Sequence, residues 1–274
     1  ADDGECLALS EFEVFGPKVK DGRSDDAEWK LQRASAVASG GEEISSNEYD
    51  DADWLPAVVP GTVLYSYIAA GAVPDPAIAD NNLHISESYF NSDFWYRWTP
   101  ATQSLTLSKR PGDRIFLTFD GINWKAEVYL NGNRLGNIAG AFRRARFDIT
   151  DLLREDGNVV AVRVIKPAHY AAVKEKNAES PDFNGDNPTF HATVGWDWMP
   201  TVRGRDMGIW NDVRIERSAP VYLSDPLVQS RLKDGLASMT VSVNVAGVSS
   251  EDVAGTLRGT IEGIEFERHI VAKA

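Results

Sequence analysis

The chain has 274 residues, enough for one large domain and part of another, and its 43% hydrophobic and 25% charged residues are ordinary for a globular protein. Its formal net charge of -13 repels phosphate backbones, and it has no basic amphipathic stretch and no apolar run of membrane-spanning length. We therefore expect neither a nucleic-acid partner nor a membrane partner. Cys6 is the only cysteine, which excludes a disulfide and a cysteine-based zinc site within the chain.

The first clear element in chain order is a helix that follows Pro60-Gly61. Thr62 can cap its first turn, because a threonine oxygen accepts a hydrogen bond from an unpaired backbone N–H. The apolar residues at positions 63, 64, 67 and 68 fall on one face, and Gly71 can end the helix in a left-handed conformation. The sequence therefore predicts one short amphipathic helix here.

Strand patterns follow in the middle of the chain. Residues 114–119 and 126–130 alternate between apolar and polar side chains, as half-buried strands do. Asn131-Gly132 follows the second of them and predicts a hairpin turn, because both residues tolerate positive φ. Residues 159–164 are almost continuously apolar and β-branched, which predicts a strand in the centre of a sheet.

The stretch 167–194 has few strand signals and is rich in Asn, Asp, Gly and Pro, with a short helix as an alternative around residues 171–178. A long irregular segment in a compact domain is usually either functional or disordered. This segment leads directly into an aromatic cluster, which favours a functional role.

Four strand-like runs follow Ser218 at regular spacing: residues 227–232, 238–245, 255–261 and 264–272. Four strands make about half of an immunoglobulin-like sandwich, which needs about 100 residues. We therefore expect an all-β chain with a first domain at residues 1–218 and a truncated immunoglobulin-like domain at 219–274. The natural protein would then continue past Ala274.

The most informative motif is a cluster of three tryptophans, two arginines and two aspartates between residues 196 and 210. An indole ring can stack on the apolar face of a sugar, and a carboxylate can grip its hydroxyl groups. The candidate sugar-contacting residues are Trp196, Asp197, Trp198, Arg203 and Arg205. The alternative is that Trp196, Trp198 and Trp210 anchor the core while the charges form surface ion pairs, and the sequence leaves both interpretations open.

A metal site has little support. The four histidines are widely scattered, at His84, His169, His191 and His269. Residues 182–186 are rich in Asp, as calcium-binding loops are. However, their glycine is not at the position that a calcium loop requires, and position 193 is Thr instead of the closing Glu. We expect no cofactor, with a structural calcium at this loop as the minor alternative.

Nine short segments occur in a characteristic order: residues 60–64, 72–76, 80–82, 94–97, 119–122, 128–132, 147–150, 158–164 and 208–213. The series, spread over about residues 50 to 230, resembles the amino-terminal sugar-binding domain of glycoside hydrolase family 2. The resemblance implies a jelly-roll, galactose-binding-like β-sandwich. The Gly195-Trp196-Asp197-Trp198 segment is similar to the branch of β-mannosidases, endo-β-mannosidases and exo-β-glucosaminidases.

The resemblance also implies roles for this segment. In β-mannosidases its first Trp and its Asp reach into the catalytic barrel and touch the terminal sugar, and these positions are Trp196 and Asp197 here. Met199 stands where many exo-mannosidases have Gly, and residues 203–206 look more like the endo-mannosidases and related bacterial members. Residues 77–79 also lack the usual aromatic side chains. The exact sugar and exo or endo action therefore stay open.

The family's catalytic glutamates lie in an (α/β)-barrel that follows the immunoglobulin-like domain. The resemblance thus implies a retaining glycosidase acting on a β-linked oligosaccharide or glycoside, with no catalytic residue in this chain and no hydrolysis by it alone. Its partner would be the barrel of the same polypeptide. The alternatives are a free-standing carbohydrate-binding module and a sandwich for protein association. Because the chain begins with Ala1 instead of Met, we expect a secreted or periplasmic protein, although a shortened chain would begin in the same way.

Overall fold

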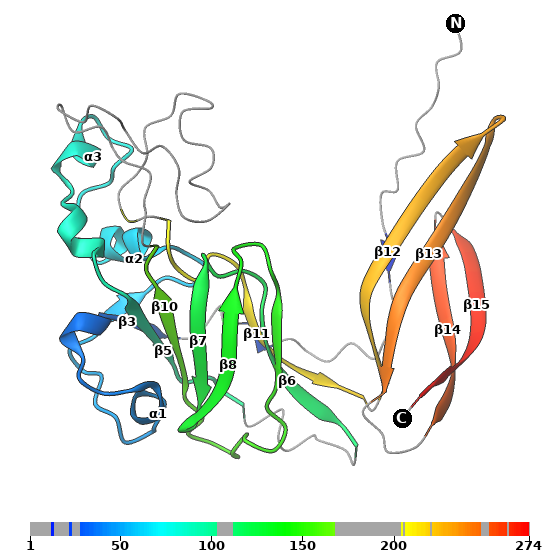
Figure 1. Ribbon diagram of the computed structural model, residues 1–274, viewed down its shortest axis with the longest axis horizontal. Helices are drawn as coiled ribbons and strands as arrows, with labels where there is room; N and C mark the ends of the chain where they lie inside the picture. Colours follow the sequence, from blue (N-terminus) through cyan, green and yellow to red (C-terminus); the bar gives the residue numbers. More distant parts are fainter. Residues whose placement is uncertain are drawn as a thin grey trace, which may run out of the picture. The chain divides into compact units, whose positions relative to one another are not determined.

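The computed structural model describes residues 12–13, 22–23, 28–102, 112–167, 204, 206–219, 221–247, 252–261 and 263–273 (Figure 1). The chain divides into two compact units. We call Asp21–Ser108 with Ile115–Glu216 the sandwich unit, and Ala1–Lys20, Lys109–Arg114 and Arg217–Ala274 the hairpin unit. The division into domains at residues 218 and 219 stays a prediction.

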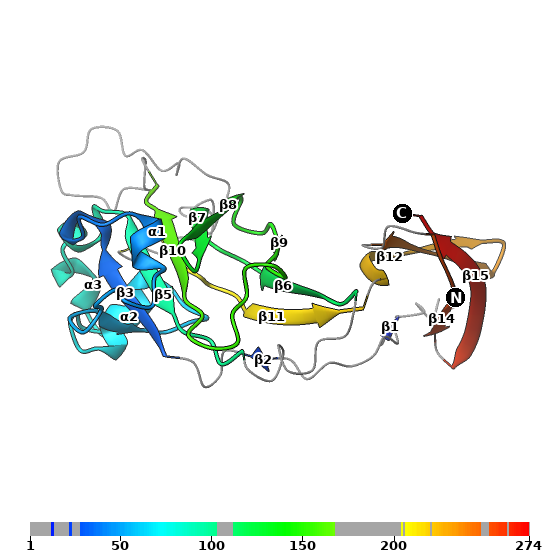
Figure 2. The same cartoon turned by 90° about the horizontal axis from the view of Figure 1, so that it is seen from below.

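The sandwich unit contains two β-sheets. The six-stranded sheet has the order β4 (Leu55–Ala57), β3 (Trp29–Arg33), β5 (Phe94–Trp98), β10 (Val160–Ile165), β7 (Lys125–Leu130) and β8 (Asn133–Ala139). It is antiparallel throughout. The four-stranded sheet has the order β2 (Gly22–Arg23), β11 (Val213–Ser218), β6 (Arg114–Phe119) and β9 (Ala145–Asp148) (Figure 2). The predicted all-β class is confirmed.

Alternating side chains build the core of the sandwich unit. Tyr96 lies opposite Leu31 on one neighbouring strand and Val162 on the other, so the three side chains share one face of the six-stranded sheet. All three are almost fully buried. The apolar side chains of β6, Ile115, Leu117 and Phe119, are buried as well. The strands predicted at residues 114–119, 126–130 and 159–164 are thus confirmed.

The opposite face of the six-stranded sheet is also covered. Strand β5 is buried at all five positions, although an exposed sheet face would leave alternate residues in water. The cover is helix α1 (Gly41–Ile44) and the chain that follows it. Ile44 and Trp54 from this segment pack against Trp95, Tyr129 and Ala161 of the sheet to form a second, smaller core.

An ion pair network holds this cover in place. The Arg97 side chain donates from Nε to the Ile44 carbonyl at 3.0 Å and from Nη2 to the Ser46 carbonyl at 2.9 Å, and its Nη1 pairs with Asp51. Lys30 Nζ lies 2.6 Å from the other carboxylate oxygen of Asp51. One guanidinium on β5 therefore connects three points of the covering segment, because its planar fork offers several donors at once.

Acid should loosen this attachment. Burial by itself would raise the pKa of the Asp51 carboxyl, but the Lys30 hydrogen bond and the nearby Arg97 charge lower it below its ordinary value of 3.8. A carboxyl with a lowered native pKa stabilises the fold above the unfolded pKa of about 3.9 and loses that contribution as pH falls through the native pKa. In urea unfolding, the gap in midpoint between wild type and Asp51→Asn should be largest near neutral pH and shrink below about pH 4. A gap independent of pH would contradict this.

The predicted hairpin turn is confirmed. Asn131 and Gly132 have φ of 51° and 83° and connect β7 to β8. The Asn131 amide donates to the Leu152 carbonyl at 2.9 Å and to Asn158 Oδ1 at 2.8 Å, and its oxygen accepts from the Val159 backbone at 2.9 Å. The asparagine therefore both permits the turn and ties it to the start of β10.

The remaining helices lie near one edge of the six-stranded sheet. Helix α2 (Val63–Ala69) is the predicted helix, and Thr62 Oγ1 accepts from the Tyr65 backbone at 3.1 Å, as a capping threonine does. Helix α3 (Asn81–His84) and the short 3₁₀ helices η2 (Ala34–Ala36) and η3 (Glu87–Phe90) were not predicted. In the described part of the chain, no helix has the length and apolar character needed to span a membrane.

The hairpin unit contains two long antiparallel hairpins. They are β12 (Val221–Lys233) with β13 (Leu236–Gly247), and β14 (Val253–Ile261) with β15 (Ile264–Ala272), and β1 (Phe12–Glu13) pairs with β14. The four predicted strands are confirmed, and the first two are longer than expected. Among the described residues of this unit, Ala272 is the only buried hydrophobic side chain, so these hairpins enclose little apolar core.

Candidate functional site

The predicted sugar-contacting residues are Trp196, Asp197, Trp198, Arg203 and Arg205, and all five lie outside the described residues. Their roles therefore stay predictions. The calcium-like loop at 182–186 and the short helix around 171–178 also lie outside the described residues. Within the described part of the chain, no group of three His, Cys, Asp or Glu side chains could hold a metal ion.

The chain that follows the predicted motif is firmly anchored. The Met207 carbonyl accepts from the Val63 backbone at 2.9 Å, and the Ile209 carbonyl accepts from Gly61 at 2.8 Å. Gly208 and Asn123 exchange two backbone hydrogen bonds, of 2.9 and 3.2 Å. Both Met207 and Ile209 are fully buried. The stretch after residue 205 thus joins the start of α2 to the loop before β7, on a rigid part of the sandwich unit.

Only glycine fits at position 208, where the chain after the motif passes close to the start of α2. Gly208 has φ of 149°, and a Cβ there would lie 2.6 Å from the Gly61 carbonyl oxygen and 2.7 Å from Thr62 Cα. No side chain fits at such distances without moving the backbone. The close approach of two chain segments therefore explains the glycine at position 208.

Trp210, the third tryptophan of the cluster, has a packing role. Its Nε1 donates to the Ala141 carbonyl at 2.9 Å, and its ring lies against Gly121, where a Cβ would meet it at 2.6 Å. Phe142 forms an edge-on contact with it at 5.7 Å between ring centroids. Trp210 is thus half-buried and packs against the loops at Gly121 and Ala141, and the roles of Trp196 and Trp198 stay predictions.

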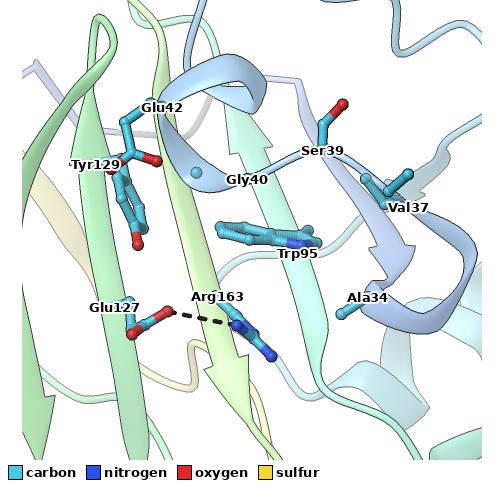
Figure 3. A pocket seen from close by; sticks show the side chains of 11 residues that line it. Ala34, Val37, Ser39, Gly40, Glu42, Trp95, Glu127, Tyr129 and Arg163 are labelled. Carbon is cyan, nitrogen blue, oxygen red and sulfur yellow. Dashed lines mark ion pairs between the residues drawn. The ribbon is translucent and has the colours of Figure 1, made fainter.

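A pocket of about 300 Å³ opens on the covered face of the six-stranded sheet (Figure 3). Strands β5, β10 and β7 form its floor, and the chain from η2 to the first turn of α1 forms its wall. Its lining residues are Ala34, Val37, Ala38, Ser39, Gly40, Gly41, Glu42, Trp95, Glu127, Tyr129 and Arg163. Figure 3 shows the Trp95 ring between Gly40 and Arg163, with Glu127 beside the guanidinium.

Strand register brings the polar groups of the pocket together. Arg163 lies opposite Trp95 on one side and opposite Glu127 on the other. Its Nη1 is 3.7 Å from Glu127 Oε2, while its Nε and Nη2 donate to one oxygen of Asp93 at 3.0 and 2.8 Å. The Trp95 and Tyr129 rings are 5.9 Å apart. Aromatic and charged side chains thus share one small concave surface.

The surroundings of Tyr129 in the pocket raise the pKa of its side chain. Burial raises the pKa of its phenol, and the nearby Glu127 carboxylate raises it further. The phenol therefore stays protonated at neutral pH and can act only as a neutral hydrogen-bonding group. None of these pocket residues was predicted to belong to a site. The sequence offered only a weak signal, the polar Glu127 and the aromatic Tyr129 at alternate positions of the strand predicted at 126–130.

Residues 29–211 match the family model of the glycosyl hydrolase 2 galactose-binding domain-like domain. The match covers most of the sandwich unit. The chain belongs to this family. The predicted resemblance to glycoside hydrolase family 2 is confirmed, with the match beginning at residue 29 instead of near residue 50.

Curated relatives of this galactose-binding-like domain are glycosidases. A mannosylglycoprotein endo-β-mannosidase of Lilium longiflorum is 34% identical over 73% of this chain and 21% of its own length. An exo-β-D-glucosaminidase of Streptomyces avermitilis is 30% identical over 90% of this chain and 25% of its own length. The chain therefore spans about a fifth to a quarter of these relatives. The β-mannosidase of Bos taurus is 29% identical, so the predicted branch is confirmed.

Solved structures agree with the fold. The exo-chitosanase of Amycolatopsis orientalis superposes with a TM-score of 0.69 over 92% of this chain and 28% of that chain, at 23% identity. A β-D-mannosidase from Dictyoglomus thermophilum gives 0.61 over 93% of this chain and 31% of that chain, also at 23% identity. At this identity the likeness concerns the fold alone.

Proposed function

We propose that this chain is the non-catalytic amino-terminal part of a retaining, β-mannosidase-like glycoside hydrolase. Its catalytic carboxylates would lie in a barrel of the same polypeptide. The observation that carries the proposal is the family match over residues 29–211, together with relatives named for mannosidase and glucosaminidase activities. The anchoring of residues 206–210 supports it further, because a substrate-contacting segment needs a rigid base.

Trp196 and Asp197 would supply the chain's part of the substrate site. An indole offers an apolar face to the C–H groups of a pyranose, and a carboxylate accepts charge-assisted hydrogen bonds from its hydroxyls. Trp198, Arg203 and Arg205 would complete this surface. A retaining glycosidase needs two further carboxyl groups about 5 to 5.5 Å apart, and in this proposal the barrel provides both.

The proposal predicts hydrolysis by a longer polypeptide and none by this chain alone. The purified 274-residue chain should release no p-nitrophenol from aryl β-mannosides or aryl β-glucosaminides. A longer polypeptide in which the same chain continues into a catalytic barrel should release it. Circular dichroism should first establish that the short chain is folded and rich in β-structure. Turnover by the folded short chain would refute the assignment of the catalytic groups to a barrel.

A second candidate is a free-standing carbohydrate-binding module, and the pocket lined by Trp95 and Glu127 is the observation that favours it. A module of this kind would bind sugar without help from another domain. A barrel-dependent substrate site would be incomplete in the isolated chain and would bind very weakly there. The hydrolysis assay on the longer polypeptide separates the two functions: release of p-nitrophenol supports the glycosidase part, whereas sugar binding without hydrolysis by any longer polypeptide supports the module.

A further inference from the structure

The pocket on the covered sheet face has the size of a single sugar ring. Its volume of about 300 Å³ is at the lower limit of ordinary small-molecule sites. Two glycines, Gly40 and Gly41, lie in its wall, and a Cβ on Gly41 would meet the Tyr129 ring at 2.3 Å. The covering chain therefore approaches the sheet closely, and the remaining hollow cannot hold a long oligosaccharide.

The guanidinium of Arg163 is held in a fixed position. Asp93 accepts hydrogen bonds from its Nε and Nη2, and Asp93 itself accepts from the Lys166 backbone at 3.0 Å. Nη1 faces Glu127 at 3.7 Å, which is longer than a direct hydrogen bond. Neither atom is therefore engaged in a direct hydrogen bond with the other, and ligand hydroxyls placed beside the pair can accept from Nη1 and donate to the carboxylate.

Glu127 is available for such a contact. Its other carboxylate oxygen lies 3.6 Å from Arg134, again beyond direct hydrogen-bonding distance, and its side chain is 25% exposed. The Arg163 side chain is 40% exposed. Donor and acceptor side by side match two neighbouring hydroxyls of a pyranose. The Trp95 ring is only 4% exposed, so it forms part of the pocket floor and offers no open face for stacking.

The charge of the pocket selects against anions. Glu42 and Glu127 both line it, and the charge of Arg163 is already offset by Asp93. A phosphate or a carboxylate ligand would meet two carboxylates and only one shared guanidinium. An uncharged polyhydroxyl ring avoids this repulsion.

We propose that this pocket binds one neutral hexopyranose unit, with Glu127 and Arg163 recognising a pair of adjacent hydroxyls beside Trp95. Its recognising residues are not the ones assigned to the substrate surface, Trp196 and Asp197. It is built entirely within the sandwich unit and needs no other domain.

Calorimetric titration of the 274-residue chain with methyl β-D-mannopyranoside tests the proposal. We expect saturable binding with a Kd on the order of 1 mM, ordinary for a ligand of this size. Glu127→Gln should weaken it about tenfold or more, because a charged acceptor is replaced by a neutral one. The matched control Glu48→Gln changes an exposed glutamate outside the pocket and should leave the Kd unchanged.

Two further measurements make the outcome decisive. Trp196→Ala should leave this binding intact, and mannose 6-phosphate should bind more weakly than the neutral glycoside. Absence of saturable binding up to ~50 mM, or loss of binding in Trp196→Ala with retention in Glu127→Gln, would overturn the pocket assignment. Absence of binding would also remove the second candidate, the carbohydrate-binding module. Neither result would affect the proposed glycosidase part, because that is judged by hydrolysis in the longer polypeptide.

Discussion

Replacement of Arg97 by alanine is expected to lower the free energy of unfolding of the sandwich unit by about 3 kcal/mol. The guanidinium is largely buried, with 8% of its side chain exposed, and its three partners are the Ile44 carbonyl, the Ser46 carbonyl and Asp51. Its removal leaves the half-buried Asp51 carboxylate paired with Lys30 and removes a charged donor from the Ile44 and Ser46 carbonyls. The loss should therefore exceed that of an ordinary surface ion pair.

Urea unfolding followed by tryptophan fluorescence can measure this effect. All eight tryptophans belong to the sandwich unit, so the signal reports that unit and not the hairpins. The control Arg143→Ala removes an exposed arginine and should change stability by less than about 0.5 kcal/mol. Arg97→Lys should recover little, since one ammonium group cannot reach three acceptors. Equal midpoints for Arg97→Ala and Arg143→Ala would show that the covering segment is held by its apolar contacts alone.

If the proposed function is correct, Asp197→Ala in the longer polypeptide is expected to lower kcat/KM about 100-fold. A carboxylate hydrogen bond to a substrate hydroxyl contributes roughly 1.5 to 3 kcal/mol, and about 1.36 kcal/mol changes the rate tenfold. The unfolding midpoint of the sandwich unit should not change if Asp197 faces substrate. Steady-state hydrolysis of an aryl β-mannoside, measured beside a thermal melt, gives both quantities.

A control for this variant is available in the polar stretch that precedes the motif. Glu179→Ala removes an acidic side chain eighteen residues earlier and should leave kcat/KM unchanged. If Asp197→Ala kept the wild-type rate, Asp197 would be removed from the substrate site. If it instead lowered stability together with the rate, the core-anchor interpretation of the cluster would be favoured.

Many of the correct structural predictions came from sequence patterns within a few neighbouring residues. The alternation of residues 114–119, the Asn131-Gly132 turn and the Thr62 cap each depend on neighbours within a few positions, and each is confirmed. Strand β3 was missed although Trp29 and Leu31 alternate within it, because a single five-residue run is a weak signal. The order of the short motifs was enough to identify the family.

The sequence by itself therefore determined the strand content, the first hairpin turn, the capped helix and the family, because these follow from side-chain periodicity and turn chemistry over short distances. Only the tertiary structure decided that the outer face of the six-stranded sheet is covered, that Arg97 anchors the cover and that Trp95, Glu127 and Arg163 meet in one pocket. The physical reason is strand register. Residues up to 68 positions apart in the chain become neighbours only when β5, β7 and β10 pair, and no local pattern encodes that pairing.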